Sequence, residues 1–431
     1  MIVLAMVACH SERNDVGSSN SEGPSKVELR NVDGKYRLYV NGQKFYVKGA
    51  GCNYGACYKV AEHGGNSIRT WSVGNEEKTA MEILDEAWEH GLMVMMGIYV
   101  ANERHGFDYD DQQAVDEQLE RIRKEVLEIK DHPALLGWGI GNELNLHYSN
   151  MKVWDAVNDI AQMIKEVDGN HVTTTMLAGI GKKEVEYIQN NCPDIDFLSI
   201  QLYGSIIHLE ERLKNANYNG PYLITEWGAT GHWEVPATEW GSPIEQTSTE
   251  KAEAIKERYQ KAILADEANC MGSYVFLWGQ KQERTPSWYG LFTEYGEKTE
   301  AINMMEYLWT NKKPENPGPR ILDIQILGEG DRYDNVYLEK DQLYTTILSI
   351  EHPHINTLSV RSEIMPEPTE TGEGGDYEPR PDSIDGLILS TGIPEITFKA
   401  PKESGAYRIF VYVTDQHHQA ATANIPFYVR H

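Results

Sequence analysis

Basic residues are scarce in this sequence. The chain of 431 residues has 39 lysines and arginines against 66 aspartates and glutamates, which gives a net charge of −27. Nucleic acids and anionic membrane surfaces are bound by clustered positive charge, so neither is expected as the main partner. With 24% charged and 40% hydrophobic residues, the composition also excludes a disordered chain, because it supplies enough apolar surface for a core.

Long apolar runs and closely spaced cysteines are missing too. No apolar stretch of about 18 residues follows the N-terminus, so the sequence predicts no transmembrane helix. The cysteine spacing matches neither a zinc site nor a disulfide framework, which favours free or buried thiols. No Asp-x-Asp-x-Asp-Gly calcium loop occurs, and we expect neither a metal nor an organic cofactor. The cysteines are Cys9, Cys52, Cys57, Cys192 and Cys270.

Residues 1–25 have the composition of a lipoprotein-like signal remnant and a flexible tether. Met1–Cys9 is apolar, and Met6–Cys9 resembles a bacterial lipoprotein cleavage box, in which Cys9 would carry the lipid. The Ser-, Asn- and Gly-rich residues that follow are typical of a flexible linker. A charged region ahead of the apolar run is missing, so a chance match is the alternative. The resemblance predicts a lipid-anchored outer-membrane or periplasmic protein of the bacterial cell envelope, which touches the membrane only through its anchor.

Residues 26–312 alternate between short apolar runs and segments with helical periodicity. Eight buried runs alternating with helices predict an α/β fold, a (β/α)₈ TIM barrel. An open doubly wound sheet is the alternative, but its glycine-rich phosphate turn after the first strand is missing. The helical segments include Glu77–His90, Asp111–Lys130, Val153–Val167 and Thr249–Glu267. The apolar runs are Tyr46–Gly49, Asn66–Thr70, Leu92–Tyr99, Leu135–Ile140, Val172–Leu177, Phe197–Leu202, Tyr222–Thr225 and Ser273–Trp278.

A proline-rich linker, residues 313–320, separates the predicted barrel from an all-β region, residues 321–431. Short strand-like runs separated by turn residues predict a C-terminal immunoglobulin-like β-sandwich. The acidic, Gly- and Pro-rich loop Pro366–Pro381 is expected to be mobile. No clear aromatic platform marks the sandwich, which is expected to support the barrel. The runs are Ile321–Gly328, Gln342–Glu351, Thr357–Ile364, Gly386–Leu389, Glu395–Lys399, Tyr407–Thr414 and Ala421–Val429.

Two glutamates follow apolar runs of the predicted barrel. The fourth run leads into Gly141-Asn142-Glu143, and the seventh leads into Thr225-Glu226-Trp227. Chemistry in such barrels takes place at the C-terminal ends of the strands. Hydrolysis of a glycosidic bond needs a pair of carboxyl groups on either side of the bond that breaks. One glutamate alone would be read as a solvated loop residue, but the pair indicates a glycoside hydrolase.

These motifs resemble clan A of the glycoside hydrolases, which are retaining (β/α)₈-barrel enzymes, over about residues 30–310. In that clan an Asn-Glu pair ends the fourth strand and supplies the acid/base, and a Glu ending the seventh strand is the nucleophile. The resemblance therefore implies Glu143 as acid/base, Glu226 as nucleophile and Asn142 as a partner of the sugar 2-hydroxyl. Retention of configuration implies carboxyl groups about 5–5.5 Å apart.

Three further positions match the clan. Arg69 lies where an arginine of the second strand supports the nucleophile. Tyr203, after the sixth run, lies where a tyrosine hydrogen-bonds the nucleophile, and Trp278, after the eighth, lies where a tryptophan floors the sugar subsite. The alternative for each is ordinary core packing.

Aromatic residues gather in the loops that follow the predicted strands. The loop after the seventh strand holds Trp227, Trp233 and Trp240, the loop after the eighth holds Trp288, and the loop after the third holds His105. Exposed rings are costly unless they cover something, and stacking on sugar faces is a natural use for them. We expect these residues to bind substrate. The alternative is that some rings pack the loops against one another.

The resemblance also implies a substrate class. A clan A barrel followed by an immunoglobulin-like domain is most similar to glycoside hydrolase family 158, which implies an endo-β-1,3-glucanase. The barrel also resembles the catalytic part of family 2. The expected partner is a neutral β-linked polysaccharide or oligosaccharide, and a monomer is expected. Two alternatives stay open: another clan A β-glycosidase of mannanase or galactosidase type, and a glycan-binding surface lipoprotein without catalysis.

Overall fold

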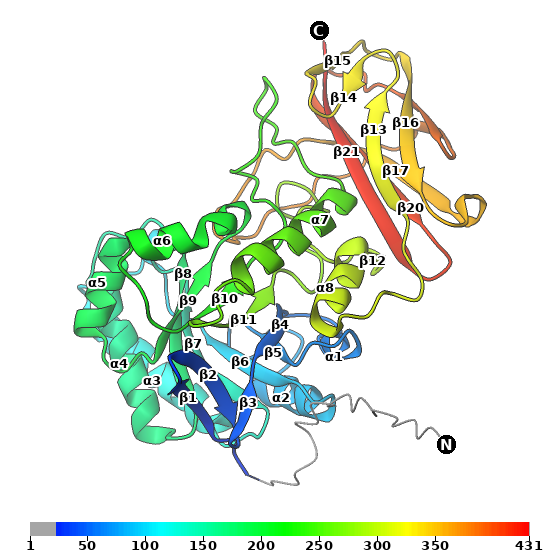
Figure 1. The fold of residues 1–431 in the computed structure, drawn as a ribbon. Coiled ribbons are helices and arrows are strands. Elements are labelled where there is room, and N and C mark those ends of the chain that lie inside the picture. The colour runs from blue at the N-terminus through cyan, green and yellow to red at the C-terminus, as the bar shows by residue number, and fades with distance from the viewer. Residues whose placement is uncertain (1–22, 431) are drawn as a thin grey trace, which may run out of the picture.

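The computed structural model describes residues 23–430 as a barrel that carries a β-sandwich near its rim (Figure 1). The lipoprotein hypothesis, including Cys9, falls on residues outside that range. No helix between residues 23 and 430 combines the length and the apolar character needed to cross a bilayer.

Eight parallel strands close into a barrel, and the predicted TIM barrel is confirmed. Each predicted apolar run forms or overlaps one strand. The strands around the barrel are β4 (Val47–Gly51), β5 (Ser67–Arg69), β6 (Met93–Ile98), β7 (Leu135–Asn142), β8 (Val172–Ala178), β9 (Phe197–Gln201), β10 (Tyr222–Glu226) and β11 (Cys270–Val275). They follow one another around the circle in sequence order, with β11 returning to β4.

Helices cover the outside of the barrel. Thr79 and Thr247 each begin a helix with a capping box, in which the threonine side chain and a glutamate three residues later satisfy backbone N–H groups. The helix between the first two barrel strands has only four residues. The predicted helix Thr249–Glu267 passes into a π-helical turn at Tyr259–Ile263. The helices are α1 (Lys59–Glu62), α2 (Ala80–Glu89), α3 (Gln112–Ile129), α4 (Lys152–Val167), α5 (Lys182–Asn191), α6 (Leu209–Asn215), α7 (Ser248–Arg258) and α8 (Glu300–Thr310).

A small antiparallel sheet closes the N-terminal end of the barrel. Its strands are β1 (Val27–Val32), β2 (Lys35–Val40) and β3 (Gln43–Phe45). Leu38 and Phe45 pack against residues at the starts of the barrel strands, such as Met93. This sheet leaves the opposite end of the barrel, where the strands finish, uncovered.

The C-terminal domain consists of two sheets around one apolar core. All seven predicted runs form strands, and the short strands β14 and β15 were not predicted. The immunoglobulin-like assignment stays a prediction. One sheet contains β15 (Val336–Leu338), β17 (Ser359–Pro366), β20 (Gly405–Thr414) and β21 (Gln419–Val429), and the other contains β13 (Arg320–Ile326), β14 (Gly330–Asp331), β16 (Leu343–Glu351), β18 (Ile388–Thr391) and β19 (Glu395–Lys399).

A buried cluster of charged side chains joins the two domains. Glu245, in the loop after β10, accepts hydrogen bonds from Lys251 Nζ at 2.5 Å and from Asn424 Nδ2 of β21 at 2.6 Å. Arg408 of β20 donates to Asn424 Oδ1 at 2.7 Å and to the Pro243 carbonyl at 2.8 Å. Burial alone would raise the pKa of Glu245, but the Lys251 charge and the hydrogen bonds hold it below its ordinary value. A short strand, β12 (Lys298–Thr299), also pairs with β21, so the sandwich is fixed to the barrel.

Replacing Glu245 by alanine is expected to destabilise the protein strongly. The substitution leaves Lys251 buried without its counter-charge, which costs about 3–5 kcal/mol of the free energy of unfolding. Urea unfolding followed by tryptophan fluorescence measures the loss. The matched control is Glu239→Ala, since Glu239 is exposed and its carboxylate accepts a hydrogen bond from Tyr337 Oη across the same interface at 2.8 Å. It should cost less than about 1 kcal/mol. Equal losses in the two variants would contradict the role given to the buried cluster.

Candidate active site

The two predicted glutamates lie in one cavity at the C-terminal end of the barrel. Glu226 is the last residue of β10, and Glu143 follows the last residue of β7. Both line a cavity of about 1290 Å³. The cavity walls come from loops after most of the barrel strands and from one loop of the C-terminal domain. The structure therefore brings the two carboxyl groups together as the sequence predicted.

Four side chains hold the Glu226 carboxylate. Arg69 Nη1 donates to its Oε1 at 2.7 Å, and Trp71 Nε1 donates to the same oxygen at 2.8 Å. Gln201 Nε2 adds a longer bond to Oε1 at 3.1 Å, and Tyr203 Oη donates to Oε2 at 3.0 Å. Burial and the nearby Glu226 charge hold the pKa of Tyr203 well above its usual value, so it stays a neutral donor. These donors fix the orientation of the carboxylate.

Asn142 belongs to the same hydrogen-bond network. Its Oδ1 accepts a hydrogen bond from Arg69 Nη2 and another, at 2.8 Å, from Gln201 Nε2. Both bonds end on the amide oxygen of Asn142, so neither of them uses the two N–H donors of its amide nitrogen. These donors are left for a ligand in the cavity. The ends of β5, β7, β9 and β10 are thus tied together around Glu226.

The β7 sequence explains how Glu143 is presented. A Cβ on Gly139 would lie 2.1 Å from Met176 Cε, so glycine leaves room for the Met176 side chain of the neighbouring strand. Gly141 has a φ of +73°, and Glu143 itself has a φ of +51°. A non-glycine residue in the left-handed region is strained, and such strain is concentrated at functional positions. The turn raises the Glu143 carboxyl out of the strand and into the cavity.

Glu143 has the environment of a carboxylic acid that keeps its proton. Burial raises its pKa well above the ordinary value of 4.5, and the Glu226 charge raises it further. Arg69 and Arg104 act in the opposite direction but do not cancel the increase. The two glutamates therefore differ as an acid and a carboxylate must, since one is surrounded by donors and the other faces a negative charge.

Trp278 and His105 both line the cavity, as the sequence predicted. Trp278 is only 3% exposed, because its ring packs on Trp309 and Phe292. His105 is exposed, and its Nε2 lies 3.2 Å from a carboxylate oxygen of Asp376. Trp278 can form a floor, whereas His105 lies at the rim.

Three of the loop tryptophans expected to bind sugar are occupied elsewhere, and that expectation was wrong. Trp227 is fully buried and stacks on Tyr259. Trp288 is also buried, and its Nε1 donates to the Thr230 carbonyl at 2.9 Å. Trp240 packs between the domains, against Tyr337 and Tyr428. None of the three lines the cavity, and each instead packs the protein against itself.

Exposed rings at the cavity come largely from residues that the sequence did not single out. Trp233 was predicted and is 60% exposed, with its edge against Tyr203. Tyr54, Tyr99 and Tyr377 also line the cavity, with at least half of each residue exposed. Trp71 and Gln201 were missed as partners of Glu226. A polar or indole side chain at the end of a barrel strand was the available signal for both.

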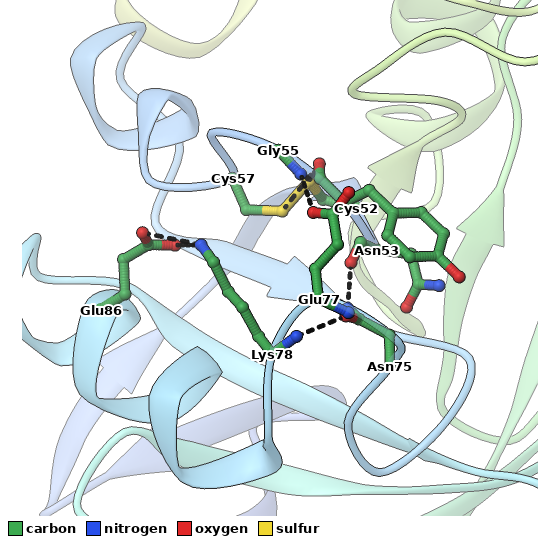
Figure 2. The surroundings of a disulfide bond; sticks show 9 residues. Cys52, Asn53, Gly55, Cys57, Asn75, Glu77, Lys78 and Glu86 are labelled. Carbon is green, nitrogen blue, oxygen red and sulfur yellow. Dashed lines mark hydrogen bonds and ion pairs between the residues drawn. A yellow bond between two sulfur atoms is a disulfide. The ribbon is translucent and has the colours of Figure 1, made fainter.

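The loop that carries Tyr54 is closed by a disulfide, which corrects the prediction of free thiols. Cys52 and Cys57 are bonded, with their Cα atoms 5.8 Å apart (Figure 2). Gly55 has a φ of +74°, which lets the short loop turn back on itself. Asn75 donates to the Asn53 carbonyl below the loop. The remaining described cysteines, Cys192 and Cys270, are free and buried, as expected.

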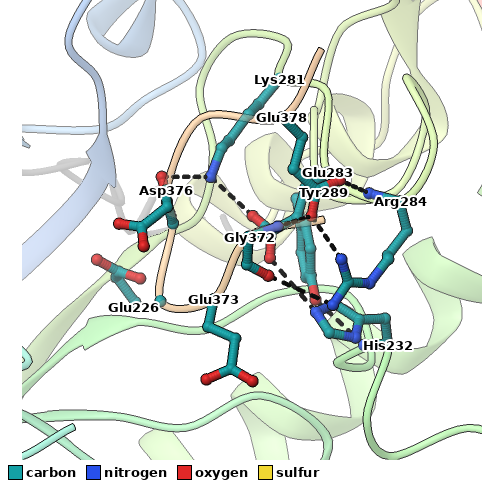
Figure 3. A network of polar contacts seen from close by, with 12 residues as sticks. Glu226, His232, Lys281, Glu283, Arg284, Tyr289, Gly372, Glu373, Asp376 and Glu378 are labelled. Atoms are coloured by element: carbon teal, nitrogen blue, oxygen red, sulfur yellow. Dashed lines mark hydrogen bonds and ion pairs between the residues drawn. The ribbon is translucent and has the colours of Figure 1, made fainter. Parts of the chain in front are cut away.

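The acidic loop Pro366–Pro381 contacts the barrel, and its mobility stays a prediction. Residues 373–377 line the same cavity as Glu226. Figure 3 shows Glu373 and Asp376 on this loop. His232, below the loop, has its pKa lowered to about 4, mainly by burial and also by Arg284, so it is neutral at neutral pH. Among residues 23–430, no group of three His, Cys, Asp or Glu side chains is arranged to hold a metal ion.

The Glu143 carboxyl is expected to titrate above the usual glutamate range and to respond to Glu226. In a Glu226→Gln variant its pKa should fall, because a negative neighbour is removed, but stay above 4.5, because burial remains. Carbon-13 NMR of labelled glutamate carboxyls, with Glu143→Gln to assign the signal, measures both values. A Glu143 pKa that is ordinary in the wild type, or unchanged in the variant, would contradict this electrostatic picture.

The disulfide predicts a specific chemical state of the purified protein. Without reduction, the peptide containing Cys52 and Cys57 should lack two hydrogens and resist alkylation, whereas the denatured protein should alkylate at Cys192 and Cys270. Peptide mass mapping with and without dithiothreitol tests this. Alkylation of Cys52 and Cys57 in the unreduced protein would refute the bond. The double serine variant should lose about 2 kcal/mol of stability, as expected for a loop this short.

Solved structures share the fold at low sequence identity. A β-D-glucuronidase of Dictyoglomus thermophilum aligns with a TM-score of 0.51 and 17% identity, over 67% of this chain and 54% of that one. A glycosyl hydrolase family 2 member of Bacteroides cellulosilyticus aligns with a TM-score of 0.46 and 12% identity, over 93% and 64%. A family 5 mannosidase of Rhizomucor miehei aligns with a TM-score of 0.46 and 14% identity, over 66% and 97%. The chain thus spans about half the length of the glucuronidase, and no curated protein sequence matches it.

The family comparison covers the part of the chain that holds both glutamates. Residues 77–307 match the model of the glycosyl hydrolases family 2 TIM barrel domain, which is more than half of the chain. The matched range runs from the loop before α2 to α8 and contains Glu143, Tyr203, Glu226 and Trp278. By its barrel domain, the chain belongs to the glycosyl hydrolases of family 2.

Proposed function

We propose that the protein is a retaining β-glycoside hydrolase that cleaves a neutral β-linked glycan. Its proposed substrate is a β-1,3-glucan, which it cuts within the chain as an endo-β-1,3-glucanase. The observation that carries the proposal is the pair of carboxyl groups in one cavity, with Glu226 held by four donors and Glu143 held protonated. This is the division of labour that double displacement at a sugar carbon requires. The barrel family supports glycoside hydrolysis, and the predicted similarity to family 158 supports the β-1,3-glucan.

Glu226 is the nucleophile in this mechanism. Its carboxylate attacks the anomeric carbon and forms a glycosyl ester while the bond to the leaving oxygen breaks. Arg69, which is almost fully buried, favours the negative carboxylate before attack. Tyr203 holds the second oxygen, so the carboxylate is oriented before substrate arrives.

Glu143 is the acid and then the base. It gives its proton to the leaving oxygen as the glycosidic bond breaks, and so becomes a carboxylate. Esterification removes the Glu226 charge, which lowers the pKa of Glu143 and prepares it to accept a proton from water. The water oxygen then attacks the anomeric carbon and restores Glu226. Because the first step needs protonated Glu143, activity should decline as pH rises through its pKa.

Asn142 has the geometry for a contact with the sugar. Its amide oxygen is fixed by Arg69 and Gln201, and its N–H groups are left for the cavity. A hydrogen bond to the 2-hydroxyl at this position strengthens in the transition state. Trp278 lines the same cavity.

The charges in the cavity favour a neutral substrate. Eight carboxyl-bearing residues line it, against four lysines and arginines. Two of those four, Arg104 and Lys281, are engaged by carboxylates, at 3.2 Å from Asp376 and 2.7 Å from Glu283. A uronic acid would meet net repulsion here, because like charges in a partly desolvated site repel.

The disulfide supports a location outside a reducing compartment. Structural disulfides persist in the periplasm and on cell surfaces, and are rare in the cytosol. This agrees with the cell-envelope location that the N-terminal sequence predicts, and the envelope is the location that we propose.

Laminarin, a soluble β-1,3-glucan, is expected to be cut internally by the wild-type protein. Early products should keep the β configuration at the new reducing end when followed by proton NMR. Glu226→Ala should abolish cleavage, by at least about 10⁴-fold, because the nucleophile is lost. Glu143→Ala should slow the cleavage of laminarin far more than that of a glucoside with a good leaving group such as 2,4-dinitrophenolate. Only the leaving oxygen of laminarin needs a proton.

A matched control separates the catalytic glutamates from acidic residues of the rim. Glu294→Gln changes a rim carboxylate of the cavity that contacts Arg380 rather than Glu226, and the variant should still cleave laminarin. An inverted first product would refute the double-displacement mechanism. Cleavage of a β-mannan or β-galactan in place of laminarin would replace the proposed substrate. No cleavage of any neutral β-glycan would favour the non-catalytic glycan-binding alternative.

A further inference from the structure

One segment of the C-terminal domain crosses the mouth of the barrel. This segment, Gly372–Glu378, is called the strap here and belongs to the connection between β17 and β18. It contacts Arg284 and Lys281 in the loop after β11, and Arg104 in the loop after β6, which is next to β7. In the closed circle β11 lies opposite β7, the neighbour of β6. The contacts of the strap with the loops after β11 and β6 therefore lie on nearly opposite sides of the mouth. Figure 3 shows the course of the strap, and its residues 373–377 line the cavity that Glu226 also lines.

One end of the strap is anchored by a buried carboxylate. Glu378 is 2% exposed, and it accepts hydrogen bonds from the backbone and the guanidinium of Arg284, both at 2.6 Å. The same carboxylate accepts a bond from Gly372 N at 2.9 Å, which closes the strap into a loop. A paired, hydrogen-bonded carboxylate in this environment is a specific docking contact, because either partner alone would be left as an unpaired buried charge.

The other contacts hold the strap backbone. Arg104 donates to the Glu373 carbonyl at 2.7 Å and to the Gly374 carbonyl at 3.3 Å, and Lys281 donates to the Gly375 carbonyl at 2.9 Å. Gly374 has a φ of +58°, and a Cβ there would lie 2.6 Å from Leu146 Cδ2 and 2.8 Å from Arg104 Nη1. The positive φ favours glycine at this point, and the strap backbone lies against the side chains of Leu146 and Arg104.

The strap presents an unpartnered ring to the cavity. Tyr377 lines the cavity and is 88% exposed, the highest value among the exposed large hydrophobic residues of the described chain. Tyr54 and Trp233 are also exposed at the cavity, on loops that follow β4 and β10. Exposed rings on three separate segments around one cavity suit a chain of sugars rather than a single one, because each sugar face covers one ring.

We propose that the strap is a wall of the substrate site, and that Tyr377 is a platform for a sugar distant from the bond that is cut. The proposal rests on the proposed glycan-cleaving function and deepens it. The C-terminal domain then contributes directly to chain binding and is not only a support.

Binding of oligosaccharides tests the strap without relying on catalysis. All proteins carry Glu226→Gln, so that the ligand stays intact, and calorimetry measures the Kd of β-1,3-linked glucose as a disaccharide and as a hexasaccharide. Adding Tyr377→Ala should weaken hexasaccharide binding by about fivefold or more, and disaccharide binding by less. The matched control is Tyr333→Ala, an exposed tyrosine of the same domain that lies outside the cavity, and it should leave both Kd values unchanged.

A second variant tests the strap as a unit. Glu378→Gln weakens its charged anchor, so the amides of Gly372–Glu378 should exchange hydrogen faster and the hexasaccharide should bind more weakly. Equal hexasaccharide binding by all variants, with laminarin still cut by the protein that keeps Glu226, would overturn the strap proposal and leave the proposed function standing. Strap-dependent binding without any cleavage would do the reverse. If neither ligand binds, the strap proposal fails as stated.

Discussion

The ion pair between Arg69 and Glu226, with its atoms 2.7 Å apart, is the interaction on which the rest of the site depends. Both side chains are almost fully buried, and a buried carboxylate is tolerated only when charge and hydrogen bonds compensate it. Trp71, Gln201, Tyr203 and Asn142 complete that compensation, and they come from the ends of three strands, β5, β7 and β9. The closed barrel brings these strand ends together around the Glu226 carboxylate.

Glu143 shows the consequence of placing a second carboxyl group beside the first. It has fewer donors and faces the charge of Glu226, and its pKa is raised for that reason. One environment favours ionisation and the other opposes it, although both residues are glutamates at the ends of parallel strands. The contrast between the two glutamates therefore arises from their surroundings, and Arg69 bonds both Glu226 and Asn142, the residue before Glu143.

Much of the fold and the centre of the site could be predicted from the sequence, because the signals are local. Apolar runs form the eight strands, and Glu143 and Glu226 follow two of them. The rings could not be assigned in this way. Trp227 and Trp288 follow barrel strands just as Trp233 does, yet they pack inward on Tyr259 and Thr230. Whether a loop ring faces substrate is decided by packing between distant segments. The composition of Pro366–Pro381 gave no sign that this loop contacts the barrel. Its partner Arg284 lies 94 residues from Glu378 in the sequence, so no local pattern could reveal the pair.

The central claim is that Glu226 forms a covalent bond to sugar, and the most direct measurement is to trap that bond. A 2,4-dinitrophenyl 2-deoxy-2-fluoro-β-D-glucoside slows both steps but keeps a good leaving group, so the ester accumulates. Intact mass followed by peptide mapping should find one fluoroglucosyl group per chain, attached to Glu226, and none in the Glu226→Gln variant. A label on another residue would contradict the account, and so would steady release of dinitrophenol without any labelled protein.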